Sequence, residues 1–279
     1  LKAIEAGSDI AFANKECLVC AGDLVMRKVR EKGVAFLPTD SEHNAIFQVF
    51  EKDNKDQIER LILTASGGPF LNRNNADLKD ITPEQAVKHP KWSMGAKISV
   101  DSATMMNKGL ELIEARYLFD MPADKITAVI HPQSLVHSFV EYKDGSFLAQ
   151  LGAPDMRTPI AYALSWPKRM QTSGERLDLL SGQFNFEMRP IEAGQFPLFD
   201  LACHALSAGQ AAQIALNAAN EVAVDCFLKK MIGFLDIVTI VDKIMNDFDD
   251  EKMISYQEIL AFDHKIRNKS HALIQEIHA

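Results

Sequence analysis

The 279-residue sequence has no excess of basic residues and no long apolar run. It carries 30 lysines and arginines against 38 acids, for a formal net charge of −8, and the basic residues form no stripe. This charge pattern argues against nucleic acid and anionic membrane surfaces as partners. No apolar run approaches the ~20 residues of a membrane-spanning helix, and we expect no signal peptide.

Cysteine is also scarce, with four residues: Cys17, Cys20, Cys203 and Cys226. Cys17 and Cys20 form a C-x-x-C pair, a spacing used in redox and zinc sites. A zinc site would need a second pair of ligands at a suitable spacing, and none is evident. We interpret all four as reduced, structural cysteines of a cytoplasmic protein.

What is present is typical of a globular chain with a sizeable core. Hydrophobic residues make up 47% and charged residues 24% of the sequence. The length allows two domains with cores of their own. The first residue is Leu1, in what reads as mid-domain sequence, so we expect a fragment of a longer protein.

The hydrophobic pattern predicts an α/β protein in several parts. Residues 1–39 read as strand, helix and strand, which predicts the end of a Rossmann-like parallel unit whose beginning is missing. Residues 40–165 mix strands and helices and read as a second part of the chain. Residues 166–191 lack a sustained period and read as a linker, and residues 192–279 predict a bundle of about four helices.

Two acids follow the second predicted strand, in the stretch "LPTDSEHNAIFQ". If the strand continues, Asp40 and Glu42 project from one face of it, because alternate strand residues share a face. Two adjacent carboxylates repel each other unless a cation lies between them. A solvated strand end is the plainer interpretation, and a metal site would need a third oxygen ligand.

A third acid occurs in "KISVDSATMMNKGLELIEARYLF". We expect a strand ending at Val100 and a helix running from Asp101 and Ser102 to about Phe119. Asn107 and Glu111 are four apart and share a face of that helix. A helix N-terminus suits a phosphate, but a Lys108–Glu111 surface pair worth only ~0.3 kcal/mol is the competing interpretation.

Two loops add weaker signals. Ser66 begins an S-G-G turn after a predicted strand, and such a turn exposes backbone donors that suit an oxyanion. His89, Trp92 and Met94 lie in a loop that is broken by Pro90 and ended by Gly95, which is typical of a lid that excludes water. A tight turn and a structural histidine are the plainer alternatives.

These segments together resemble one enzyme family. The stretches "ANKE", "DSEHNAIFQ", "SGGPF", "HPKWSMG", "ISVDSATMMNKGLE", "HPQSLVHS", "APDMRTPIAYALSWP" and "LNAANEVAV" occur in the order found in 1-deoxy-D-xylulose 5-phosphate reductoisomerases. That family acts in the non-mevalonate pathway of isoprenoid biosynthesis and uses NADPH. Its glycine-rich G-x-T-G-S-I-G fingerprint is absent from this sequence.

The resemblance implies that residues 40–165 are the catalytic domain, which binds metal and substrate, and it implies a role for each matching residue. Asp40, Glu42 and Glu111 would hold one Mg²⁺ or Mn²⁺, and their all-oxygen donors suit such hard cations. The substrate would be bound by Lys15, Ser41, Glu42, Ser66, His89, Trp92, Met94, Ser102, Asn107, Lys108 and Glu111. The expected catalytic residues are Lys15, Glu42, His89 and Glu111, and the expected NADPH contacts are Asn14, Glu16 and Gly95.

The implied reaction is a metal-dependent rearrangement of the sugar phosphate followed by hydride transfer from NADPH. It would yield 2-C-methyl-D-erythritol 4-phosphate, in a homodimeric enzyme of the bacterial cytoplasm. Without the glycine-rich turn that anchors the pyrophosphate, we expect the chain as given to be inactive alone. The alternatives are a metal- and phosphate-binding module and a metal-dependent aldolase or isomerase that needs no nicotinamide.

Overall fold

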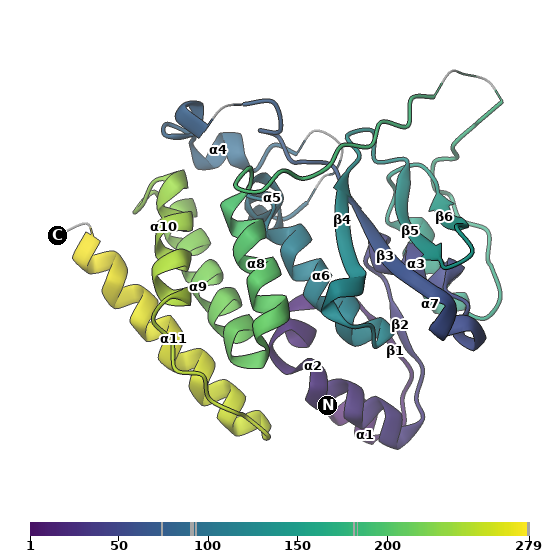
Figure 1. Ribbon diagram of the computed structural model, residues 1–279, viewed down its shortest axis with the longest axis horizontal. Coiled ribbons are helices and arrows are strands. Elements are labelled where there is room, and N and C mark those ends of the chain that lie inside the picture. Colours follow the sequence, from purple (N-terminus) through teal and green to yellow (C-terminus); the bar gives the residue numbers. More distant parts are fainter. Residues whose placement is uncertain (74, 90–91, 93, 181, 183, 278–279) are drawn as a thin grey trace. The chain divides into compact units, whose positions relative to one another are not determined.

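The structure, a computed structural model, describes residues 1–73, 75–89, 92, 94–180, 182 and 184–277. Its chain divides into two compact units that alternate along the sequence (Figure 1). The first unit comprises Leu1–Asn14, Val25–Ser66 and Ala115–Ile191. The second comprises Lys15–Leu24, Gly67–Glu114 and Glu192–Ala279. The domain boundaries expected from the sequence are contiguous segments, and they stay predictions.

The first unit contains the β-structure of the described residues. Strands β1 (Ile10–Phe12) and β2 (Phe36–Pro38) pair in parallel, as the sequence predicts. A second sheet has the order β4-β3-β5-β6, in which β3 pairs in parallel with β4 and antiparallel with β5. Its strands are β3 (Ile58–Ala65), β4 (Ile126–Ile130), β5 (Val136–Tyr142) and β6 (Phe147–Leu151).

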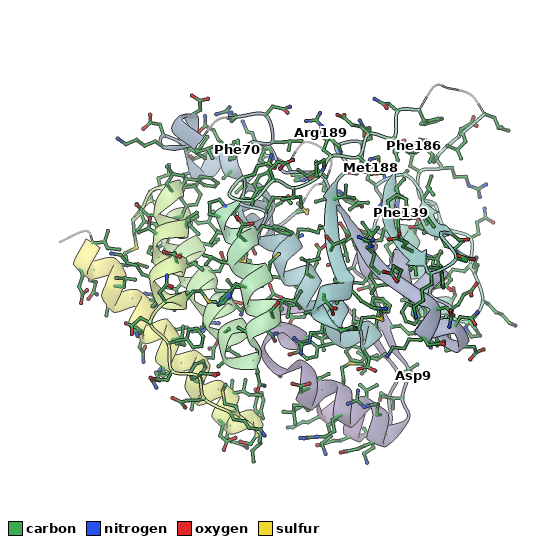
Figure 2. All side chains as sticks on the ribbon, in the orientation of Figure 1. Asp9, Phe70, Phe139, Phe186, Met188 and Arg189 are labelled. Atoms are coloured by element: carbon green, nitrogen blue, oxygen red, sulfur yellow. The ribbon has the colours of Figure 1, made fainter. Side chains whose placement is uncertain are left out.

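The helices of this unit pack on its sheets. α3 (Ser41–Val49) packs on β5 and β6, and α7 (Arg157–Ser165) packs on α3, β1 and β2. The short elements are α1 (Lys2–Glu5) and the 3-10 helices η1 (Lys52–Gln57) and η3 (Ala123–Lys125). Phe139, labelled in Figure 2, lies edge-on to Phe147 with ring centroids 6.4 Å apart, which links β5 to β6.

The second unit is helical. Its C-terminal part confirms the predicted four helices, α8 (Pro197–Ala208), α9 (Gln210–Leu228), α10 (Phe234–Met245) and α11 (Tyr256–Ile277). α9 contacts the other three, and Figure 1 shows the four side by side. Almost all of α9 is buried, and this explains its many alanines, which let neighbouring helices approach closely. The unit also holds α4 (Pro83–Ala86), α5 (Ala96–Ala103) and the 3-10 helix η2 (Asn75–Leu78).

Two helices contribute residues to both units, α2 (Lys15–Lys32) and α6 (Met106–Phe119). The apolar stripe predicted for α6 is confirmed, because Met106, Leu110 and Ile113 are fully buried. Among the described residues, no helix is long and apolar enough to span a membrane.

Two predictions about local structure are wrong. Residues 97–100 are part of helix α5, although their alternating pattern had favoured a strand. Asp40 and Glu42 do not continue β2, because the chain turns into α3 directly after Thr39. Asp40 is the N-cap of that helix and Glu42 lies in its first turn.

Candidate active site

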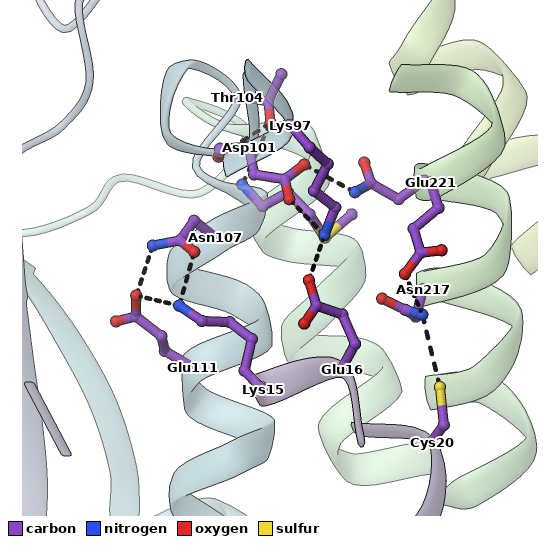
Figure 3. A network of polar contacts seen from close by, with 12 residues as sticks. Lys15, Glu16, Cys20, Lys97, Asp101, Thr104, Asn107, Glu111, Asn217 and Glu221 are labelled. Atoms are coloured by element: carbon purple, nitrogen blue, oxygen red, sulfur yellow. Dashed lines mark hydrogen bonds and ion pairs between the residues drawn. The ribbon is translucent and has the colours of Figure 1, made fainter. Parts of the chain in front are cut away.

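Four of the predicted site residues meet in one buried cluster of the second unit, and Figure 3 labels three of them, Lys15, Asn107 and Glu111. The Lys15 ammonium donates to Asn107 Oδ1 at 2.8 Å and to Glu111 Oε1 at 3.0 Å. Lys108 donates to the other oxygen of Glu111, and the Asn107 amide donates to Oε1. We refer to Lys15, Asn107, Lys108 and Glu111 as the α6 cluster.

The helix period explains how α6 presents these groups. Asn107, Lys108 and Glu111 lie at spacings of three and four, so their side chains share a face. Lys15 comes from the first turn of α2, 96 positions away. Glu111 is only 1% exposed and Lys108 only 4%, so the interpretation as a surface ion pair is wrong.

A second polar network lies beside this cluster and was not predicted from the sequence. Lys97 Nζ is 2.8 Å from both Glu16 Oε1 and Asp101 Oδ2, and Asn220 Nδ2 donates to Asp101 Oδ1 at 2.8 Å (Figure 3). Asp101 and Asn220 are fully buried. Lys97 and Asp101 are four residues apart, which indicates an ion pair only if the segment is helical, and the sequence had favoured a strand there.

The charges of this network shift its pKa values. Burial by itself would lower the pKa of Lys97, but the negative charges of Asp101 and Glu16 outweigh it and raise that pKa. Burial would raise the pKa of Glu16, whereas the ammoniums of Lys97 and Lys15 lower it further than burial raises it. Lys97 and Glu16 are therefore both charged near neutral pH.

Ser102 does not lie at a helix N-terminus, which corrects the prediction. It belongs to the last turn of α5, and α6 begins only at Met106 after a turn in which Met105 has a φ of 62°. The first turn of α6 therefore holds Asn107 and Lys108 rather than Ser102.

The glycine turn after β3 approaches Ser102 closely. Gly68 has a φ of 71°, and a Cβ placed on it would lie 2.5 Å from the Ser102 carbonyl oxygen. Only glycine allows this contact between the turn and the end of α5. Two segments of the predicted phosphate site, Gly68 and Ser102, are thus adjacent.

The first unit holds the other two acids at the start of α3. Asp40 Oδ1 accepts from the Ser41 backbone N–H at 2.9 Å, and Ser41 Oγ donates to Glu42 Oε2 at 2.6 Å. The carbonyl of Pro38 accepts from the Asn44 amide at 2.8 Å, which fixes the turn from strand to helix. A helix N-terminus interacts favourably with nearby carboxylates, which suits two acids at the start of α3.

The predicted lid is only partly covered by the described residues, since Pro90, Lys91 and Ser93 lie outside them. His89 and Trp92 are each half-buried, and the Trp92 backbone N–H donates to His89 Nδ1 at 2.9 Å. Burial lowers the pKa of His89 below its ordinary value. The ring is therefore neutral at pH 7, with Nδ1 as the acceptor.

The remaining predicted residues are divided between the units. Asn14, Ser41 and Ser66 belong to the first, and Met94 and Gly95 belong to the second. Gly95 precedes α5, and a Cβ placed on it would meet nothing within 4 Å. The predicted metal ligands also come from both units, so their convergence stays a prediction.

Comparison with known proteins identifies the family to which the chain belongs. A family described as the 1-deoxy-D-xylulose 5-phosphate reductoisomerase C-terminal domain matches residues 36–119, and the DXP reductoisomerase C-terminal domain matches residues 151–269. The reductoisomerase of Zymomonas mobilis is 52% identical over 280 residues, which cover 100% of this chain and 72% of that protein. The chain belongs to the 1-deoxy-D-xylulose 5-phosphate reductoisomerase family.

Another relative and two solved structures support the same family assignment. The reductoisomerase of Chlorobium phaeobacteroides is 56% identical over 96% of this chain and 70% of its own length. A reductoisomerase crystal structure in complex with NADPH, fosmidomycin and magnesium has a TM-score of 0.94 and 44% identity, and it is matched over 99% of this chain and 72% of its own. The Zymomonas mobilis enzyme in complex with NADPH has a TM-score of 0.90 and 49% identity, matched over 98% and 70%.

Membership of this family confirms the function predicted from the motifs. The chain belongs to an NADP-dependent oxidoreductase of the non-mevalonate pathway, which forms 2-C-methyl-D-erythritol 4-phosphate from 1-deoxy-D-xylulose 5-phosphate. A binding module and a nicotinamide-independent aldolase or isomerase are thereby set aside. Family membership does not by itself assign roles in binding or catalysis to individual residues.

Proposed function

We propose that the α6 cluster is where this enzyme binds the sugar phosphate. One observation carries the proposal: two buried lysine ammoniums and an amide converge on the buried carboxylate of Glu111. Burying charged side chains is costly unless they are paired, so such groups are retained mainly where function needs them. Lys108 and Asn107 are assigned to the phosphate, together with Ser66 and Ser102, and Lys15 and Ser41 to the sugar oxygens.

The acids suit the divalent cation that the family uses. Asp40, Glu42 and Glu111 offer only carboxylate oxygens, the donors that Mg²⁺ and Mn²⁺ prefer. In the structure the ammoniums of Lys15 and Lys108 pair with the two oxygens of Glu111, so a metal ion bound to this carboxylate would take the place of at least one of them. When bound, the metal supplies Lewis-acid polarisation of the substrate's carbonyl and hydroxyl oxygens.

The other residues orient the substrate and exclude water. His89, with Trp92 and Met94, is assigned to the loop that covers the phosphate, and its neutral imidazole can donate from Nε2 while Nδ1 holds the Trp92 N–H. Asn14, Glu16 and Gly95 are assigned to NADPH. Lys97 neutralises Glu16, so this carboxylate does not repel an anionic cofactor.

Substitution of Lys108 tests the proposal. In Lys108→Ala a charge-assisted hydrogen bond to the phosphate is lost, a contribution of about 1.5–3 kcal/mol, so affinity should fall by about 10- to 150-fold. The readout is isothermal titration with 1-deoxy-D-xylulose 5-phosphate. The matched control is Lys229→Ala on α9, which removes an exposed lysine paired with Asp225. Unchanged affinity in a folded Lys108→Ala protein would refute the assignment.

We also propose that the first unit forms a homodimer interface along β6. This strand is at the edge of the four-stranded sheet and exposes Phe147, Leu148 and Leu151. An apolar edge strand with unpaired backbone groups favours pairing with a second copy. On nearby α7, Ile160 and Leu164 are exposed as well.

The location we propose is the bacterial cytoplasm. All four cysteines are free thiols in the structure, and such thiols persist in a reducing compartment. The relatives named above are bacterial enzymes. Fractionation of the native host tests this, and recovery of the protein outside the cytoplasmic fraction would contradict it.

A further inference from the structure

The first turn of α2 carries Lys15, and its orientation is not determined by the rest of that helix. α2 contains a kink at Ala21, where φ is −133° and ψ is 25°. Leu18 and Val19 before the kink are fully buried, and polar contacts add to this packing in setting the direction of the turn. Those contacts come from three helices of the second unit.

Each contact is made by a different residue of the turn. Lys15 reaches Asn107 and Glu111 on α6, and Glu16 reaches Lys97 on α5. At the end of the turn, the amide of Asn217 on α9 donates to Cys20 Sγ at 3.5 Å (Figure 3).

Lys97 connects this turn to two other helices of the second unit. Its ammonium is 2.8 Å from Glu16 and 2.8 Å from Asp101, and Asp101 is 1% exposed. The second oxygen of Asp101 accepts from Asn220 on α9. The chain of contacts thus runs from the helical bundle through α5 to the residue next to Lys15.

Consecutive residues of an α-helix point about 100° apart. Fixing Glu16 against α5 therefore fixes the rotation of the turn and with it the direction of Lys15. We propose that Lys97 is a positioning residue, which through Glu16 holds the Lys15 ammonium against Asn107 and Glu111. This inference rests on the proposed function in one respect, that Lys15 contacts the substrate.

Accessibility of Lys15 tests the inference without any ligand. The native protein and Lys97→Met are treated briefly with acetic anhydride, and acetylation of each lysine is measured by mass spectrometry. Lys15 is 5% exposed, so its acetylation is slow in the native protein and should rise several-fold in Lys97→Met. Lys108, 4% exposed and held by α6 itself, is the internal control and should not change.

Three further variants serve as a conservative replacement, a substitution of the partner residue and a matched control. Lys97→Arg keeps the positive charge and should restore slow acetylation of Lys15. Glu16→Gln weakens the same link without removing the partner of buried Asp101, so it replaces Lys97→Met if that variant does not fold. Lys229→Met removes another lysine paired with an aspartate four residues away, and should leave Lys15 unchanged.

Turnover then separates this inference from the proposed function. A misplacement of about 1 Å can cost up to ~100-fold in rate. In an enzyme that joins this chain to an NADPH-binding domain, Lys97→Met should therefore lower kcat by about 10- to 100-fold and Lys97→Arg much less. If Lys15→Ala retains full activity, the proposed role of Lys15 is wrong, whereas the acetylation result still decides the positioning. Unchanged acetylation of Lys15 in Lys97→Met, or an equal rise at Lys15 and Lys108, would overturn the inference.

Discussion

The Lys15 ammonium and the Glu111 carboxylate form a buried ion pair, with Nζ 3.0 Å from Oε1, although 96 positions separate them in the chain. Glu111 accepts from Lys108 and Asn107 as well. These three donors hold the Glu111 carboxylate in one orientation, as a residue that binds a ligand requires.

Substitution of Glu111 should lower turnover, and it should also destabilise the fold, because buried Lys15 and Lys108 lose their carboxylate partner. Glu111→Gln keeps the shape of the side chain but loses the charge, and we expect NADPH oxidation with 1-deoxy-D-xylulose 5-phosphate to fall by about 100-fold or more. Steady-state kinetics over a range of Mg²⁺ concentrations measures this, with circular dichroism to show that the variant folds. Asp225→Asn, at an exposed pair on α9, is the control. Normal turnover in Glu111→Gln would exclude this residue as a ligand.

His89 should titrate below the ordinary histidine pKa of about 6.5, because burial disfavours its charged form. The folded-state pKa is thus lower than the unfolded one. The stability that His89 contributes is present above pH ~6.5 and is lost as the pH falls through its folded pKa. Protonation of Nδ1 would also break the hydrogen bond from the Trp92 N–H.

Nuclear magnetic resonance of the histidine rings can check both points. His89 accepts at Nδ1, so its neutral form should carry the proton on Nε2. His131 accepts backbone N–H groups of Leu135 and Val136 at Nε2, so its proton should be on Nδ1. Opposite tautomers are the expected result, and the same tautomer in both rings would contradict the contacts of His89.

The packing of α6 against α8 should tolerate no added methyl group at Gly109. A Cβ placed there would lie 2.3 Å from the Cβ of Ala202. Gly109→Ala should therefore destabilise the protein by about 1–3 kcal/mol, measured by urea unfolding. Gly182→Ala is the control, because its nearest neighbours are at ordinary contact distance, 3.9 Å or more. Equal stability of the two variants would mean that the helices separate at little cost.

The sequence predicted much of this site because its signals are local. Helical spacing placed Asn107 and Glu111 on one face, and the strand-helix-strand pattern of residues 1–39 was found as expected. The errors in secondary structure arose where a short segment fits both the two-residue period of a strand and the 3.6-residue period of a helix. Residues 97–100 alternate as a strand does, yet burial of Ser99 and Val100 in the second unit makes them helical.

The Lys97 network could not be predicted for the same reason. Its partners, Glu16 and Asn220, are far away in sequence, and only tertiary packing brings them to α5. Asp40 shows a different limit. An aspartate after a strand is equally a strand end or a helix N-cap, and the following residues decide between them.

The edge strand β6 should govern association. Leu148→Glu places a charge on an exposed apolar edge, and we expect it to weaken self-association by about 10-fold or more. Analytical ultracentrifugation measures this. Leu260→Glu on α11, where the leucine is similarly exposed, should leave association unchanged. A native protein that remains monomeric at all concentrations would contradict the proposed interface.

A crystal structure of the protein with Mn²⁺ and 1-deoxy-D-xylulose 5-phosphate tests the central claim most directly, because anomalous scattering locates the ion. We predict one Mn²⁺ bound by carboxylate oxygens of Asp40, Glu42 and Glu111, with the substrate phosphate in contact with Lys108 and Asn107. An ion bound away from Glu111, or a phosphate that contacts neither Lys108 nor Asn107, would contradict the account.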